Sequence, residues 1–239
     1  MNMTHAVSSL VRRVDDTIEQ AAGRFPMYAE PTTGVWTWSD DGGWFGGFWP
    51  GLLWLSAAAT QDAQYARAAA GAAARLSPRT SAPTILRGFL SWYGAGLGFD
   101  LGYAGRDTAD LATAAARSVS ADFDPVAQLL PPGDEDASEY HWPRPGACID
   151  GLPGTIPLLA FASRQMQDPV LRSMALAHAR GHHAMCVRED GSVAQSATYD
   201  QDGNVTSQTT IDGSSKGSTW SRAQAWAMLG LTHSTAAWT

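Results

Sequence analysis

Residues 149–185 have the sequence IDGLPGTIPLLAFASRQMQDPVLRSMALAHARGHHAM, and this stretch decides the fold. Its first half is the more apolar, which is typical of a helix buried on most sides. Asp168 and Pro169 then mark a new helix start, with the carboxylate as N-cap and proline at the first helical position. The second half is rich in alanine and amphipathic. The stretch therefore predicts a helical hairpin, with an apolar helix followed by an outer amphipathic one.

Two similar pairs of segments precede this hairpin. An apolar segment at 50–60 is followed by an alanine-rich segment from Asp62, and the apolar segment 88–103 is followed by another from Asp107. Asp62 and either Asp107 or Thr108 are the predicted N-caps. The intervals between the pairs fit repeated hairpins with variable loops. A first helix at 8–22 and a last one at 220–237 complete the predicted set.

Repeated hairpins of this kind are the building blocks of an α/α toroid. We predict an all-α fold, an (α/α)6-toroid-like barrel forming a single domain over residues 1–239. Six hairpins contain about twelve helices, whereas we predict about eight. We therefore expect a ring that is incomplete at its C-terminal end, whether truncated, open or completed by a partner chain. An open ring would expose apolar surface and favour self-association.

Strand signals are weak outside one segment. Residues 190–210 are rich in Gly, Ser, Thr and Asp and predict a short hairpin around Asp202 and Gly203. Elsewhere the pattern is helical.

Composition excludes several classes of function. Hydrophobic residues make up 44% of the 239 residues and charged residues 16%, as in globular proteins. A net charge of −7 without any basic run argues against nucleic acid as a partner. No window has the roughly 20 apolar residues of a membrane span, and we recognise no signal peptide. Cys148 and Cys186 form no metal-binding or disulfide pattern, so we predict a cytoplasmic protein with reduced thiols.

Aromatic residues gather near the N-terminal end of the chain. Five of the tryptophans lie between residues 36 and 54. Most of these rings are expected in the core. The glycine-rich setting of Trp44, within DGGWFGG at 41–47, favours exposure of at least one ring, and indole faces stack on sugar rings.

Six motifs, taken in order, resemble glycoside hydrolase family 88, the unsaturated glucuronyl hydrolases. They are WFGGFWPGLLWL at 44–55, RGFLSWYGAGLGF at 87–99, ADFDP at 121–125, IDGLPGTIPLLAFAS at 149–163, VREDGS at 187–192 and WSRAQAWAMLGL at 220–231. Together they span nearly the whole chain. Each motif is weak by itself, and their order makes the resemblance specific.

The resemblance implies an α/α toroid that hydrates the C4=C5 double bond of unsaturated uronic-acid oligosaccharides produced by polysaccharide lyases. In that family an aspartate protonates the double bond and activates water, without metal or cofactor. Asp150 matches this catalytic aspartate. Its neighbours Ile149 and Leu152 are apolar and would raise its pKa. From the residues alone, the alternative is that Asp150 merely caps a helix.

The resemblance also implies a set of substrate-binding residues. Arg222, in a run similar to the family's WARGQAW, would pair with the substrate carboxylate, although it could equally be a helix-surface arginine. Trp44 and Trp142 match positions that flank the pocket and are predicted to stack on sugar. Trp220 and Trp226 are six residues apart and do not share a helix face, so we expect at most one of them to stack on sugar and the other to lie in the core.

Three departures from the family concern the site itself. Leu86 stands where relatives carry an aspartate, and Asp100 is a second-choice carboxylate. Gln195 replaces a histidine and Asp212 replaces a glutamine, and we predict both as substrate-binding residues. The departures leave two alternatives open. One is a toroid hydrolase or isomerase for a neutral sugar that uses Asp150 with Asp212, and the other is a non-catalytic sugar-binding relative.

Two histidines have the spacing of a metal site. His178 and His182 are four residues apart on a predicted helix, but no glutamate follows in HExxH fashion. We interpret them as part of a solvated helix face and predict no metal.

Overall fold

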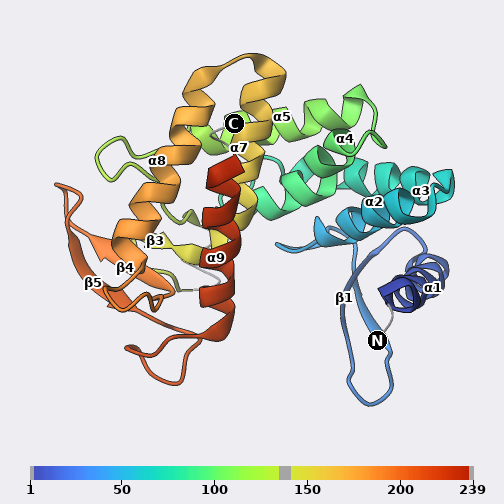
Figure 1. Cartoon of the computed structure of the whole chain (residues 1–239), viewed down its shortest axis with the longest axis horizontal. Helices are drawn as coiled ribbons and strands as arrows, with labels where there is room; N and C mark the ends of the chain where they lie inside the picture. The colour runs from blue at the N-terminus through green and yellow to red at the C-terminus, as the bar shows by residue number, and fades with distance from the viewer. Residues whose placement is uncertain (1–2, 135–140, 237–239) are drawn as a thin grey trace. The chain divides into compact units, whose positions relative to one another are not determined.

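The computed structural model describes residues 3–134 and 141–236 (Figure 1). The chain forms two compact units. The first contains Met1–Thr80 and Phe89–Ala112, and the second contains Ser81–Gly88 and Thr113–Thr239. None of the helices in the described part of the chain combines the length and apolar character of a membrane span.

The first unit is built around a helical hairpin. Its elements are α1 (Met3–Ala21), β1 (Phe25–Ala29), β2 (Trp36–Ser39), α2 (Phe48–Thr60), α3 (Ala63–Arg75), a short turn η1 (Ser77–Arg79), the π-helical stretch η2 (Phe89–Gly96) and α4 (Leu97–Asp100). Trp54 of α2 is fully buried and donates a hydrogen bond from Nε1 to the Gly94 carbonyl at 3.0 Å. This bond ties α2 to η2. Phe25 and Leu53 lie in the same core cluster.

The second unit places helices against a small sheet. Its elements are β3 (Gly146–Cys148), a single turn η3 (Ile149–Gly151), α7 (Leu152–Met166), α8 (Pro169–Cys186), β4 (Ser196–Tyr199), β5 (Val205–Thr209) and α9 (Ser221–Ala236); α5 (Arg106–Ser120) begins in the first unit and ends in this one. The strands are antiparallel in the order β3–β4–β5. α7 packs against both α8 and α9, and Figure 1 shows these three helices together.

The predicted helical architecture is confirmed, and so is the hairpin around Asp202 and Gly203, which joins β4 to β5. Strands β1, β2 and β3 were not predicted. β3 has only three residues, and the β1–β2 pair contains a register shift between Pro26 and Tyr28, so neither produces a long alternating pattern.

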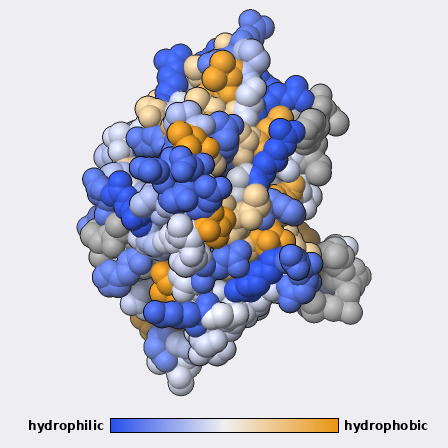
Figure 2. All heavy atoms as spheres, turned by 90° about the vertical axis from the view of Figure 1, so that its left-hand side faces the viewer, coloured by the Kyte–Doolittle hydropathy of each residue, from blue (hydrophilic) through white to orange (hydrophobic). Residues whose placement is uncertain are grey.

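The sheet ends in a polar edge. β5 has the sequence VTSQT, and most of its residues are exposed. Figure 2 looks onto the side of the chain where β5 lies in Figure 1, and hydrophilic residues cover most of the described part of this face. An exposed edge strand with polar side chains is less prone to pair with another chain.

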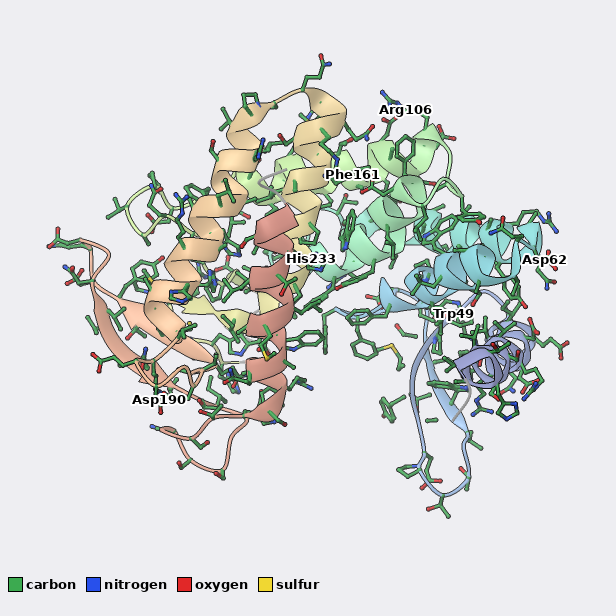
Figure 3. All side chains as sticks on the ribbon, in the orientation of Figure 1. Trp49, Asp62, Arg106, Phe161, Asp190 and His233 are labelled. Atoms are coloured by element: carbon green, nitrogen blue, oxygen red, sulfur yellow. The ribbon has the colours of Figure 1, made fainter. Side chains whose placement is uncertain are left out.

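Two of the three predicted N-caps are confirmed. The Asp62 carboxylate accepts a hydrogen bond from the Gln64 amide at the start of α3 (Figure 3), and Asp168 accepts one from the Val170 amide at the start of α8. The prediction for Asp107 or Thr108 is wrong. α5 already begins at Arg106, so both residues lie inside its first turn.

Replacing Asp168 by alanine should lower the free energy of unfolding by about 1 kcal/mol, because the Val170 amide loses its acceptor. Urea denaturation measures the change. Asp168→Asn keeps a side-chain oxygen and should unfold almost like the wild type. Equal losses in both variants would show that the charge, and not the capping hydrogen bond, stabilises α8.

Candidate functional site

Asp150 lies in the short turn η3, between the end of β3 and the first residue of α7. The residue is 6% exposed. The alternative that it caps a helix is wrong, since the N-cap positions of η3 and α7 are Cys148 and Gly151 and neither helix start has a side-chain cap. Asp150 Oδ2 accepts a hydrogen bond from Gln195 Nε2 at 3.2 Å. Asp150 Oδ1 is buried and has no hydrogen-bond partner among the described residues.

Gln195 connects Asp150 to a second carboxylate. Its Nε2 also donates to Asp212 Oδ2 at 2.7 Å. Its Oε1 accepts hydrogen bonds from the backbone amides of Ile211 and Asp212, at 3.0 and 3.1 Å. Gln195 is fully buried, whereas Asp212 is exposed. The structure therefore brings three of the predicted site residues into one hydrogen-bonded group.

The sheet explains how these residues meet. Cys148 of β3 pairs with Ser196 of β4, and the backbone amide of Ile149 donates to the Gln195 carbonyl at 2.9 Å. The residue after β3 and the residue before β4 are thus held side by side. Asp150 follows directly in the chain. Asp212 comes from the loop that follows β5.

Burial raises the pKa of Asp150 from its usual 3.8 to about 6. The hydrogen bond from Gln195 and the positive charge of Arg222 act in the opposite direction, and the negative charge of Asp212 raises the pKa further. A carboxyl group with a pKa near 6 can both donate and accept a proton close to neutral pH. This is the property expected of a general acid that also acts as a base.

Arg222 lies in the first turn of α9 and is exposed. Its guanidinium carbon lies 4.0 Å from the ring centroid of Trp220, the residue just before the helix. Such a cation–π contact holds the guanidinium in place while leaving its N–H donors for an anion. Trp220 and Trp226 are both half-buried, so neither ring is a fully enclosed core residue.

The remaining predicted residues are not part of this hydrogen-bonded group. Trp142 belongs to the second unit and is 6% exposed. Trp44 and Asp100 belong to the first unit. Within it, the half-buried Trp44 ring meets Phe45 edge-on at a centroid distance of 4.8 Å, and Asp100 is exposed at the end of α4.

Leu86, at the position where the family carries an aspartate, is buried and apolar. The neighbouring Arg87 is also buried. Its guanidinium donates to the Thr84 carbonyl and Ser118 Oγ, both at 2.8 Å, and pairs with Asp122. These contacts give Arg87 a structural role at the end of α5.

The interpretation of the histidines as solvated is wrong. His178 and His182 are both fully buried on α8. His178 Nδ1 accepts the backbone amide of Leu130 at 3.1 Å, and His182 Nδ1 donates to the His178 carbonyl at 2.9 Å. Burial lowers the pKa of both rings, so they are neutral at physiological pH. Among the described residues, no group of three or more histidine, cysteine or acidic side chains is arranged to hold a metal ion.

Sequence reasoning missed one neighbour of Asp150. Cys186, the last residue of α8, is a fully buried free thiol. Burial, and then the charge of Asp150, raise the pKa of this thiol to about 12. It is therefore uncharged beside the site. His178, His182 and Cys186 follow each other at intervals of four, so the helical period would have placed the thiol on the same face as the two rings.

Known proteins of one kind are similar to this chain over most of its length. No protein-family model matches the chain. An unsaturated glucuronyl hydrolase of Bacillus sp. (strain GL1) is 30% identical over 222 residues, which is 90% of this chain and 57% of that protein. The chain is therefore similar to the unsaturated glucuronyl hydrolases. The resemblance seen in the motifs is thereby confirmed.

Solved structures of unsaturated glucuronyl hydrolases have the same fold as this chain. The crystal structure of the enzyme from Bacillus sp. GL1, described as responsible for the degradation of glycosaminoglycan, matches with a TM-score of 0.87 and 27% identity over 98% of this chain and 62% of its own. A variant named UGL, with dGlcA-Glc-Rha-Glc, matches with a TM-score of 0.88 and 26% identity over 99% of this chain and 63% of its own. The chain thus spans 57% to 63% of these relatives.

Proposed function

We propose that the site hydrates the C4=C5 double bond of unsaturated uronic-acid oligosaccharides of the kind that polysaccharide lyases release. One observation carries the proposal. Asp150 is a buried carboxyl group with one oxygen held by Gln195 and the other without a partner in the part of the chain that the structure describes. Its raised pKa, about 6, suits a group that must give and take back one proton.

The proposed reaction follows from this arrangement. Asp150 carries its proton on Oδ1, since Oδ2 already accepts the N–H of Gln195. The acid form protonates C4 of the double bond, and positive charge develops at C5 beside the ring oxygen. The resulting carboxylate takes a proton from the water that attacks C5. Asp150 ends protonated, and the hydrated sugar then rearranges and releases its aglycone.

Arg222 supplies the contact to the substrate carboxylate. Its exposed guanidinium, held over Trp220, can form two parallel hydrogen bonds to a carboxylate. Its positive charge also acts on Asp150, so the two groups belong to one electrostatic environment. We therefore expect the anionic end of an unsaturated uronate to lie near Arg222.

A second function is favoured by one contact. Asp150 and Asp212 both accept hydrogen bonds from the same Gln195 nitrogen. Paired carboxyl groups, one protonated and one charged, are the catalytic groups of many hydrolases that act on saturated glycosides. The alternative is therefore a hydrolase or isomerase for a neutral sugar, with Asp150 as acid and Asp212 as base.

A substrate panel tests these functions. The protein is mixed with unsaturated disaccharides from chondroitin, hyaluronan or gellan, and loss of the ultraviolet absorbance of the conjugated double bond is followed. We expect turnover of at least one of them and none of saturated, neutral glycosides. Activity on the neutral glycosides alone would favour the Asp150–Asp212 pair. Binding without any turnover would support a sugar-binding protein and overturn the enzymatic proposal.

The proposed location is the cytoplasm. Both cysteines are free and buried, as expected where thiols are kept reduced.

A further inference from the structure

The side-chain amide of Gln195 has no hydrogen-bonding position left for a sugar. The two hydrogens on Nε2 are directed to Asp150 Oδ2 and Asp212 Oδ2. The two lone pairs of Oε1 accept the backbone amides of Ile211 and Asp212. An amide has two donors and two acceptor positions, so all four are used within the protein. Gln195 is also fully buried.

The orientation of this amide is fixed by its surroundings. Exchanging its oxygen and nitrogen would set Oε1 against two carboxylate oxygens and the NH2 group against two backbone N–H donors. Each of the four contacts would become repulsive. All four hydrogen-bonding positions of the buried amide are satisfied in this orientation, which favours a single arrangement. The backbone of the loop after β5 therefore fixes the orientation of the amide. The amide in turn holds one oxygen of each carboxyl group.

We infer that Gln195 is a positioning residue whose side-chain amide holds the carboxyl groups of Asp150 and Asp212 as one coupled pair. The inference rests on the proposed function only where turnover is the readout. It assigns Gln195 a role through Asp150 and not through direct contact with the substrate.

Three side chains act on the pKa of Asp150, and Cys186 is an uncharged neighbour. Asp212, from the loop after β5, is negative and favours the protonated form of Asp150. Arg222, from α9, is positive and favours the carboxylate. Cys186, from α8, is a neutral thiol. The N–H of Gln195 favours the carboxylate as well. Asp212 therefore raises the pKa of Asp150, and Gln195 lowers it.

Because Asp212 and Gln195 shift the pKa of Asp150 in opposite directions, two variants test the inference. Asp212→Asn removes the negative charge but keeps an oxygen for Gln195, so it should lower the pKa of Asp150. Gln195→Met removes the N–H donor at similar size and should raise this pKa. We expect about a tenfold change in proton affinity in each case. The Asp150 carboxyl carbon is titrated by NMR in protein with ¹³C-labelled aspartate, and its signal is assigned with Asp150→Asn.

A matched control removes a different glutamine. Gln208→Met deletes an amide that donates to the Met185 carbonyl at 2.8 Å and contacts neither carboxylate. It should leave the titration of Asp150 unchanged. If Asp212→Asn and Gln195→Met also leave it unchanged, the pair is not coupled and the inference fails.

Turnover gives an independent readout. The pH profile of kcat/KM should shift to lower pH with Asp212→Asn and to higher pH with Gln195→Met. Each shift should equal the change in the pKa of Asp150 measured by NMR. A purely structural role for Gln195 would lower the thermal stability of Gln195→Met without moving this profile, and would contradict the inference. NMR shifts of opposite sign in a protein that turns over no unsaturated disaccharide would support the coupling and overturn the proposed function.

Discussion

Replacing Asp150 by asparagine is expected to lower kcat on unsaturated disaccharides by about 1,000-fold, within the range of a lost general acid and base. An amide of the same size cannot donate a proton to C4 or accept one from water. The hydrogen bond from Gln195 is kept, because the asparagine oxygen can take the place of Asp150 Oδ2. Measurement of kcat from the loss of ultraviolet absorbance tests the result. Turnover by Asp150→Asn at the wild-type rate would contradict the proposed mechanism.

The same substitution should stabilise the protein at neutral pH. The pKa of Asp150 is raised to about 6 in the folded chain, so the folded state binds this proton more tightly than the unfolded state. Ionisation of Asp150 therefore lowers the free energy of unfolding as the pH rises from about 4 to about 6. Above that range the full loss, up to about 3 kcal/mol, is present. Asp150→Asn should unfold at a higher urea concentration at pH 8, and the gain should disappear at pH 4.

This pairing of lost activity with gained stability also serves as the folding control. A variant that is inactive because it is misfolded would be less stable than the wild type at both pH values. An inactive variant that is more stable at pH 8 has lost only the chemistry of Asp150. Such an exchange of stability for activity is common at catalytic sites.

Replacing Gly88 by alanine is expected to lower the free energy of unfolding by about 3 kcal/mol or more, among the largest effects of a single substitution. A Cβ atom at this position would lie 2.4 Å from both the Gly154 carbonyl carbon and the Thr155 nitrogen. These are backbone atoms of the first turn of α7, so no side chain can move aside. Thr155 Oγ1 also donates to the Ile85 carbonyl, which fixes the same segment.

Gly71→Ala is the matched control for Gly88→Ala. Gly71 lies inside α3, and a Cβ atom there would meet no atom within 4 Å. Alanine is a better helix former than glycine, so this variant should gain up to about 1 kcal/mol. Urea denaturation of both variants measures the contrast. A mild loss in Gly88→Ala would mean that 81–88 does not approach α7 as closely as described.

The helices were predictable because their signals are local. Asp168 and Pro169 mark the start of α8 within two residues, and the helical period of the apolar positions then gives its length. The strands depend on partners distant in sequence. Gly146–Cys148 becomes β3 only because Ser196–Tyr199 lies beside it, and three residues give no alternating pattern of their own.

The site was predictable in part for the same reason. Asp150 stands in a motif that resembles a known family, so its importance could be inferred from neighbouring residues. Its link to Asp212 through Gln195 depends on the β3–β4 register and on the loop after β5, which the sequence does not specify locally. The error over His178 and His182 arose because a spacing of four places two rings on one face without indicating whether that face is covered.

The path of the chain between its two compact units limits how the molecule can be divided. The chain leaves the first unit after Thr80, returns at Phe89 and leaves again within α5. A fragment that starts at Thr113 would carry Asp150, Gln195 and Asp212 but would lack the octapeptide Ser81–Gly88, which packs on the start of the helix behind Asp150. Neither unit is therefore one continuous segment of the chain, so neither can be produced or exchanged as a single fragment.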